Sequence, residues 1–218
     1  MNKYISIAEA NFKSIIKYKA SIFLLIMQAL TQFIVMASLW EAIFKNTTVV
    51  QGYNYYEMIQ YYFGVTVLSY FCFYAVDWEL NEDVHSGHFG IILLKPCSIM
   101  TYYFSKMIGD RVANIIFGLL PISFLWLIFI RGDVPFSFIN LFLGLASILL
   151  AMILWFLLSF SFAMLSFWLE NIFFILTVKE ILIQFISGII IPINFFPDYI
   201  QKIFWVLPFR YIAFEPMQ

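Results

Sequence analysis

Residues 139–169 read INLFLGLASILLAMILWFLLSFSFAMLSFWL, a stretch that contains no aspartate, glutamate, lysine or arginine. A helix rises about 1.5 Å per residue, and the hydrocarbon core of a bilayer is about 30 Å thick. About 20 consecutive apolar residues therefore cross a bilayer, and this stretch exceeds that length. It predicts a transmembrane helix that is tilted or that extends beyond the membrane.

The composition of the whole chain agrees with a membrane location. Hydrophobic residues make up 63% of the 218 residues, charged residues make up 11%, and the mean hydropathy is +0.91. A soluble domain contains about 45–50% apolar and about 25% charged residues, so this chain could not cover its surface with polar groups in water. The net charge of −1 provides no basic field for a nucleic acid. Cys72 and Cys97 are too few for a disulfide framework.

Five segments are long and apolar enough to span a bilayer: residues 20–44, 56–76, 105–130, 139–169 and 172–191. A further apolar stretch follows Pro192, but prolines and charged residues interrupt it. We expect short, re-entrant or interfacial helices there, within an outer segment of residues 192–215. The sequence predicts an all-α integral membrane protein, a polytopic helix bundle of five spans that forms a single domain over residues 1–218.

The N-terminal segment, residues 1–19, predicts an amphipathic helix that lies along the membrane surface and leads into the first span. The apolar run after it has about 25 residues, whereas the core of a cleavable signal peptide has about 7–15, so we expect that this segment is not a cleavable signal peptide. Apolar residues recur on one face at helical spacing and charged residues occupy the other: Ile5, Ala8, Phe12, Ile15 and Ile16 against Lys3, Glu9, Lys13 and Lys17.

Basic residues are unevenly distributed between the two sides of the predicted spans. Because cytoplasmic loops of membrane proteins carry an excess of lysine and arginine, the richer side is expected to be cytoplasmic. This orientation predicts a multi-pass protein of the cell membrane with a cytoplasmic N-terminus. The richer side holds Lys3, Lys13, Lys17, Lys19, Lys95, Lys106, Arg111 and Lys179, and the other side holds Lys45, Arg131, Lys202 and Arg210.

The loop between the second and third spans, residues 77–104, is the most distinctive polar segment. It begins with DWELNEDVHSGHFGIILLKP over residues 77–96. A short helix parallel to the membrane and ended by Pro96 fits this mixture of polar and apolar residues, and a solvated connector fits it as well. His85 and His88 share one face of such a helix, but the chain has no third histidine, so we expect no metal site.

Polar residues inside the predicted spans are few. Gln28 and Gln32 lie one helical turn apart in the first span, and Glu180 and Gln184 lie one turn apart in the fifth. Polar groups in lipid are costly and often mark a transport path. Hydrogen bonds between helices explain such residues equally well, so both interpretations remain open for these four.

Motifs of catalysis are absent from the sequence. It contains no phosphate-binding loop of the form Gly-x-x-x-x-Gly-Lys-Ser/Thr, no His-Glu-x-x-His and no Gly-x-Ser-x-Gly. We therefore expect that the chain is not an enzyme and binds no cofactor of its own.

Three features follow one another along the chain: the amphipathic N-terminal helix, the long inner loop and the proline-interrupted outer segment. This order resembles the membrane subunit of a type-2 ABC exporter. The closest likeness is to a branch of permeases whose inner loop carries an acidic residue, Ser-Gly, Leu-Leu, a basic residue and proline in that order. Here the loop reads DVHSGHFGIILLKP over residues 83–96, and LPFRY at residues 207–211, followed by Pro216, is similar to that branch's segment before its last span.

The resemblance implies six spans in each permease subunit, and the pattern here shows five, so the sixth span is missing from it. The resemblance also implies two such subunits, identical or different, that meet in the lipid bilayer. It also implies a separate ABC ATPase subunit on the cytoplasmic face, which would bind ATP and magnesium. Residues 195–211 would form outer re-entrant helices, with Phe195, Pro197, Pro208, Phe209 and Arg210. The inner loop would dock on the ATPase through Glu79, Glu82, Asp83, His85, Ser86, Gly87, Leu93, Leu94 and Pro96.

Two other functions fit a membrane protein of this composition. One is an accessory or immunity-type protein that acts without turnover and without an ATPase. The other is an ion-coupled secondary transporter, although such a transporter usually shows an internal repeat, and none is visible in this sequence.

Overall fold

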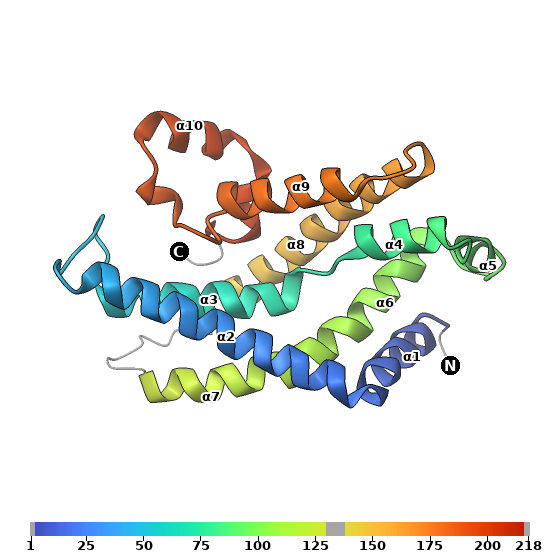
Figure 1. Cartoon of the computed structure of the whole chain (residues 1–218), viewed down its shortest axis with the longest axis horizontal. Helices are drawn as coiled ribbons and strands as arrows, with labels where there is room; N and C mark the ends of the chain where they lie inside the picture. The colour runs from blue at the N-terminus through green and yellow to red at the C-terminus, as the bar shows by residue number, and fades with distance from the viewer. Residues whose placement is uncertain (1–2, 130–137, 216–218) are drawn as a thin grey trace.

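The computed structural model describes residues 3–129 and 138–215, and over these residues the chain is an all-α membrane protein, as the sequence predicts. Within them, β pairing is limited to one isolated bridge between Val50 and Tyr53. The helices labelled in Figure 1 are α1 (Lys3–Lys17), α2 (Lys19–Phe44), α3 (Tyr55–Cys72), α4 (Val76–His85), α5 (Phe89–Leu93), α6 (Ile99–Asn114), α7 (Leu120–Phe129), α8 (Phe138–Ala163), α9 (Phe173–Ile186) and α10 (Asp198–Val206).

Four segments of the described residues are long and apolar enough to cross a bilayer: Lys19–Phe44, Tyr55–His85, Ile99–Phe124 and Phe142–Phe167. They overlap the first four predicted spans. The predicted fifth span is shorter, because α9 has 14 residues, or about 21 Å of helix. The chain turns at Gly188, which has a φ of +84° and whose carbonyl accepts a hydrogen bond from Tyr61 Oη at 2.6 Å. The described residues therefore hold four full-length helical spans rather than five.

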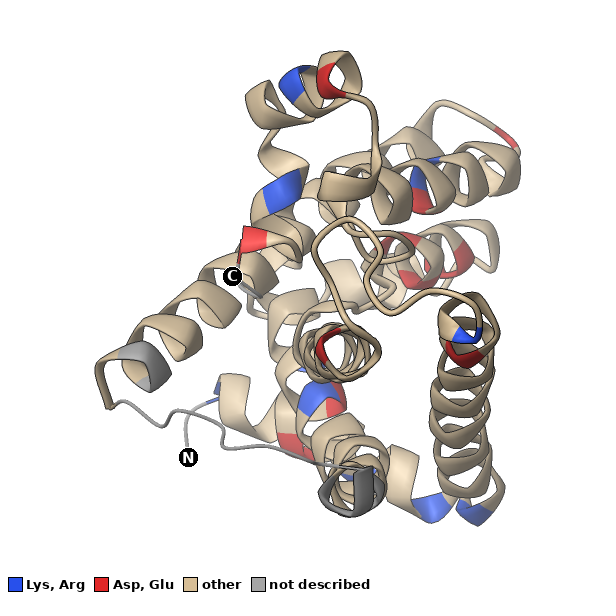
Figure 2. Ribbon diagram, turned by 90° about the vertical axis from the view of Figure 1, so that its left-hand side faces the viewer, with Lys and Arg blue, Asp and Glu red and all other residues tan. Residues whose placement is uncertain are grey.

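The helices run between two ends of the molecule (Figure 1). One end holds α1 and α5, and the other holds α10 and the connection between α2 and α3. The helix α3 packs against α2 and α8 and buries Met58, Val65 and Leu68. Figure 2 shows long stretches of helix without a charged residue. Large apolar side chains on the outside of α2 and α8, such as Leu24 and Leu150, are exposed and suit contact with lipid.

The N-terminal helix α1 lies against α6. Gly109 of α6 permits this close approach, because a Cβ atom at that position would lie 2.1 Å from the carbonyl oxygen of Ala8. Asn11 Nδ2 also donates a hydrogen bond to the carbonyl of Lys106 at 2.8 Å. The helix expected from the amphipathic pattern is therefore present, while its place at the membrane surface stays a prediction.

Gly109→Val is expected to detach α1 from α6, because the added side chain has no room beside the carbonyl of Ala8. Overpacking of this kind costs about 1–3 kcal/mol. Proteolytic cleavage within α1 should become about tenfold faster, which corresponds to about 1.4 kcal/mol. Gly144→Val is the control, because Gly144 has open space around it. Equal cleavage rates in the two variants would contradict this packing.

Candidate functional site

The candidate site lies at a break in the second spanning segment. The helix α3 ends at Cys72 and α4 begins at Val76, so the helix can leave carbonyl groups in the last turn of α3 without a donor. The carbonyl of Ser69 accepts from the N–H of Phe73 at 3.1 Å, and Nη1 of Arg111 on α6 supplies the donor to the carbonyl of Tyr70 at 3.2 Å and a second, longer contact to Ser69 at 3.4 Å. A cation at a helix C-terminus also interacts favourably with the helix dipole. The helix α6 thereby fixes the position of the break.

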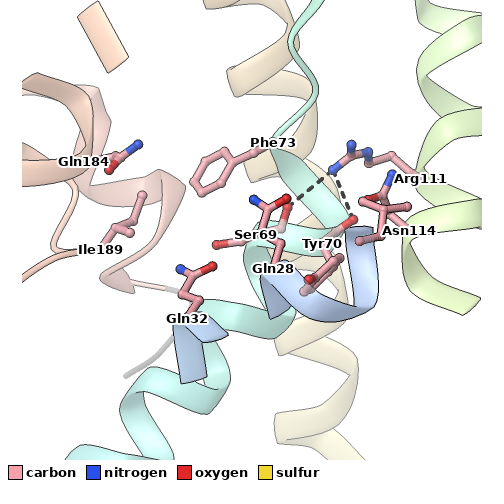
Figure 3. A pocket seen from close by; sticks show the side chains of 10 residues that line it. Gln28, Gln32, Ser69, Tyr70, Phe73, Arg111, Asn114, Gln184 and Ile189 are labelled. Carbon is pink, nitrogen blue, oxygen red and sulfur yellow. Dashed lines mark hydrogen bonds between the residues drawn. The ribbon is translucent and has the colours of Figure 1, made fainter. Parts of the chain in front are cut away.

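A pocket of about 250 Å³ lies beside this break (Figure 3). The helices α2, α3 and α6 line it, together with α9 and the turn after α9. Three of the four residues predicted for a transport path, Gln28, Gln32 and Gln184, line this one pocket. The fold therefore brings together residues that are far apart in the sequence, and their role in transport stays a prediction.

Glu180, the fourth of these residues, lies outside this pocket. It lines a neighbouring pocket of about 180 Å³ with Gln184 and Trp155. Trp78 Nε1 donates a hydrogen bond to the Glu180 carboxylate at 2.7 Å. Glu180 therefore helps to hold α4 against α9.

Arg111 and Asn114 also line the main pocket, although the sequence pattern did not assign them to the transport path. Both lie near the predicted inner end of the third span, where polar residues are inexpensive. In the structure, Arg111 is 9% exposed and Asn114 is 8% exposed. Arg111 forms an ion pair with Asp110, and Asn114 Nδ2 donates to the same carboxylate at 2.9 Å. The i, i+4 spacing of Asp110 and Asn114 is the one sequence signal that could have indicated this network.

A second ion pair holds α4 against α9. Lys179 Nζ contacts Asp77 Oδ2 and lies 3.3 Å from Ser159 Oγ of α8. The side chains of Lys179 and Asp77 are 2% and 0% exposed, so each charge depends on the other for compensation. Asp77 lies in the first turn of α4, where the helix dipole favours a negative charge.

Two acids that were expected to dock on an ATPase turn inward. Residues 77–85, expected in a loop, form most of α4, which packs against α8. Glu79 forms an ion pair with Lys106 of α6, and Asp83 accepts a hydrogen bond from Tyr103 Oη at 2.7 Å. These partners lie 27 and 20 residues away along the chain, so no local pattern indicates them. Glu82 is the exposed acid of this segment.

The other residues predicted for docking lie at the α4–α5 tip, which comprises residues 82–96. Gly87 turns the chain there with a φ of +77°, a conformation that residues with a side chain rarely adopt. Within the described residues, no cluster of three or more His, Cys, Asp or Glu side chains could hold a metal ion. The exposed members of the predicted set are Glu82, His85, Ser86, Gly87, Leu93, Leu94 and Pro96.

The outer segment folds into short helices at Ile193–Phe195, Asp198–Val206 and Pro208–Ile212. Arg210 forms an ion pair with Glu215 at 2.7 Å, and its guanidinium lies 4.1 Å from the centre of the Trp205 ring. The Phe195 ring lies 5.7 Å from that of Trp40 on α2. The residues predicted for this segment, Phe195, Pro197, Pro208, Phe209 and Arg210, thus lie in or beside these helices, and a re-entrant role stays a prediction.

The fold and the site define a multi-pass, all-α membrane protein with a polar pocket among its spans and a helical tip at one end. The family described as ABC-2 family transporter protein matches residues 25–218. The match covers most of the chain, so the chain belongs to the ABC-2 transporter family and is a membrane component of transport. Comparisons with curated proteins and with solved structures found no match.

Proposed function

We propose that the chain is the transmembrane subunit of an ABC exporter, with a cytoplasmic N-terminus. In this proposal a separate ABC ATPase, which binds ATP and magnesium, docks on the α4–α5 tip. A second permease subunit, identical or different, completes the translocation path. Family membership supports the general role. The observation that carries the finer assignment is an exposed tip at the end of α4, a helix whose residues Asp77 and Glu79 form ion pairs with two helices that line the pocket.

The chemistry of the tip suits a protein partner. Ile91, Leu93 and Leu94 are 56%, 58% and 84% exposed, and Glu82 lies on the same tip. Apolar side chains of this size serve as anchors when they enter a pocket on a partner. The expected partner surface is an apolar groove with a basic rim that pairs with Glu82.

The contacts of α4 connect the tip with the pocket. The Asp77–Lys179 pair joins α4 to α9, which carries Gln184. The Glu79–Lys106 pair joins α4 to α6, which carries Arg111. A displacement of the tip by the ATPase would therefore move two helices that line the pocket, which is the coupling that an exporter requires.

Leu94→Asp is expected to reduce the amount of ATPase that copurifies with the tagged chain in mild detergent by at least about tenfold, because a charge would enter an apolar contact. Val206→Asp is the control, because Val206 is 85% exposed and ends α10, a helix that lies at the other end of the molecule from α5 (Figure 1). Mass spectrometry of the copurified proteins measures the amount of ATPase for both variants.

A folded wild-type chain that copurifies with no ATPase would contradict the proposal and favour an accessory protein. Transport that follows an ion gradient without an ATPase would favour a secondary transporter.

A further inference from the structure

The main pocket contains three side-chain amides that have no hydrogen-bond partner within the described part of the chain: Gln28, Gln32 and Gln184. Figure 3 shows the two residues of α2 on one side of the pocket and Gln184 on the other. Each amide offers two N–H donors and one carbonyl acceptor. An amide without a hydrogen-bond partner inside a bilayer is unfavourable in free energy. These three amides therefore need a partner that does not belong to the described residues.

The charge in the pocket is already compensated. The Nε and Nη2 atoms of Arg111 donate to the Asp110 carboxylate, and Nη1 donates to the carbonyls of Ser69 and Tyr70. An anionic ligand would have to displace Asp110 from the guanidinium. A cationic ligand would find no carboxylate free, because Asp110 is engaged by Arg111 and Asn114. The groups available to a ligand are therefore neutral donors and acceptors.

The size and position of the pocket limit the ligand further. A volume of about 250 Å³ lies below the range of about 300–1,000 Å³ that is usual for sites enclosing a whole small molecule. Gln28 and Gln32 are exposed on α2, a helix whose other exposed side chains include Phe23 and Leu24. A polar group could enter from the lipid side while its apolar chain stays in the bilayer.

We propose that this pocket binds the uncharged headgroup of an amphiphile, a headgroup that carries hydroxyl or amide groups. This inference rests on the proposed function and names the class of cargo for the exporter. The amides of Gln28, Gln32 and Gln184 would donate to and accept from the headgroup. Arg111 would hold the break between α3 and α4 and would not contact the ligand as a charge.

The test uses the full chain in lipid nanodiscs and three probes with the same acyl chain: 1-oleoylglycerol, its phosphate ester and oleoylcholine. Native mass spectrometry measures how much of each probe binds. The neutral probe is expected to bind at least about tenfold more tightly than either charged probe. Gln28→Leu combined with Gln32→Leu should weaken the binding of the neutral probe by about 25-fold, since each lost hydrogen bond contributes about fivefold. Gln60→Leu is the control, because Gln60 is exposed on α3 and does not line the pocket. This variant should bind the neutral probe as the wild type does.

Asp110→Asn supplies the opposite test, because it releases the charge of Arg111. Binding of the phosphate ester to this variant is expected to rise at least about tenfold. A wild-type preference for a charged probe, or glutamine variants that bind as the wild type does, would overturn the headgroup assignment. If an ATPase still copurifies in that case, the proposed function stands. If the neutral probe binds through Gln28 and Gln32 but no ATPase copurifies, the proposed function fails and the headgroup assignment stands.

Discussion

Lys179→Met is expected to lower the free energy of unfolding by about 3–5 kcal/mol, because it leaves the charge of Asp77 buried without a partner. The side chain of Asp77 is fully buried, and its Oδ1 atom has no hydrogen-bond partner within the described residues. Lys179 is therefore the main compensation for this carboxylate. Equilibrium unfolding in mixed micelles, with sodium dodecyl sulfate as the denaturant, measures the change.

The double variant Asp77→Leu with Lys179→Met distinguishes a charge effect from a packing effect. Replacement of both members of a buried ion pair by apolar residues is often neutral or stabilising, so we expect stability within about 1 kcal/mol of the wild type. Lys13→Met is the control, because the Lys13–Glu9 pair is exposed and such pairs contribute about 0–1 kcal/mol. A double variant as unstable as Lys179→Met would show that the ion pair is not what stabilises this contact.

Arg111→Met is expected to cost about 2–4 kcal/mol, measured in the same titration. The substitution removes the partner of Asp110 and the donors to the carbonyls of Ser69 and Tyr70. In contrast to the Asp77–Lys179 pair, removal of the acid, Asp110, should not restore the stability that Arg111→Met loses. With Asp110→Leu added, the carbonyl of Tyr70 at the end of α3 still lacks a donor. Full rescue would contradict the role of Arg111 at the helix break.

Sequence patterns account for the spanning helices and for the family. Apolar runs predict α2, α8 and the segments that contain α3 and α6, because the length of a run decides whether it can cross a bilayer. The predicted length of α9 was wrong because hydropathy does not detect a turn. At Gly188 the chain leaves the helix, and a Cβ atom there would lie 3.0 Å from Tyr61 Oη.

The candidate site could be predicted only in part. Gln28, Gln32 and Gln184 could be identified because an amide inside an apolar run is conspicuous. The break after Cys72 could not, because the residues that follow it include no glycine or proline. The burial of Asp77 could not be predicted either, because its partner Lys179 lies 102 residues away along the chain. A run of acidic residues instead indicates a solvent-exposed segment.

A photocrosslinking measurement tests the central claim, docking of an ATPase on the α4–α5 tip, most directly. Benzoylphenylalanine replaces Leu94 in one sample and Val206 in another, two positions that are 84% and 85% exposed. They follow α5 and end α10, helices that lie at opposite ends of the molecule (Figure 1). After illumination of native membranes, mass spectrometry identifies the crosslinked partner. We expect a nucleotide-binding ATPase subunit crosslinked at position 94 and none at position 206. Crosslinks to an ATPase at position 206 alone, or at neither position in a folded chain, would contradict the claim.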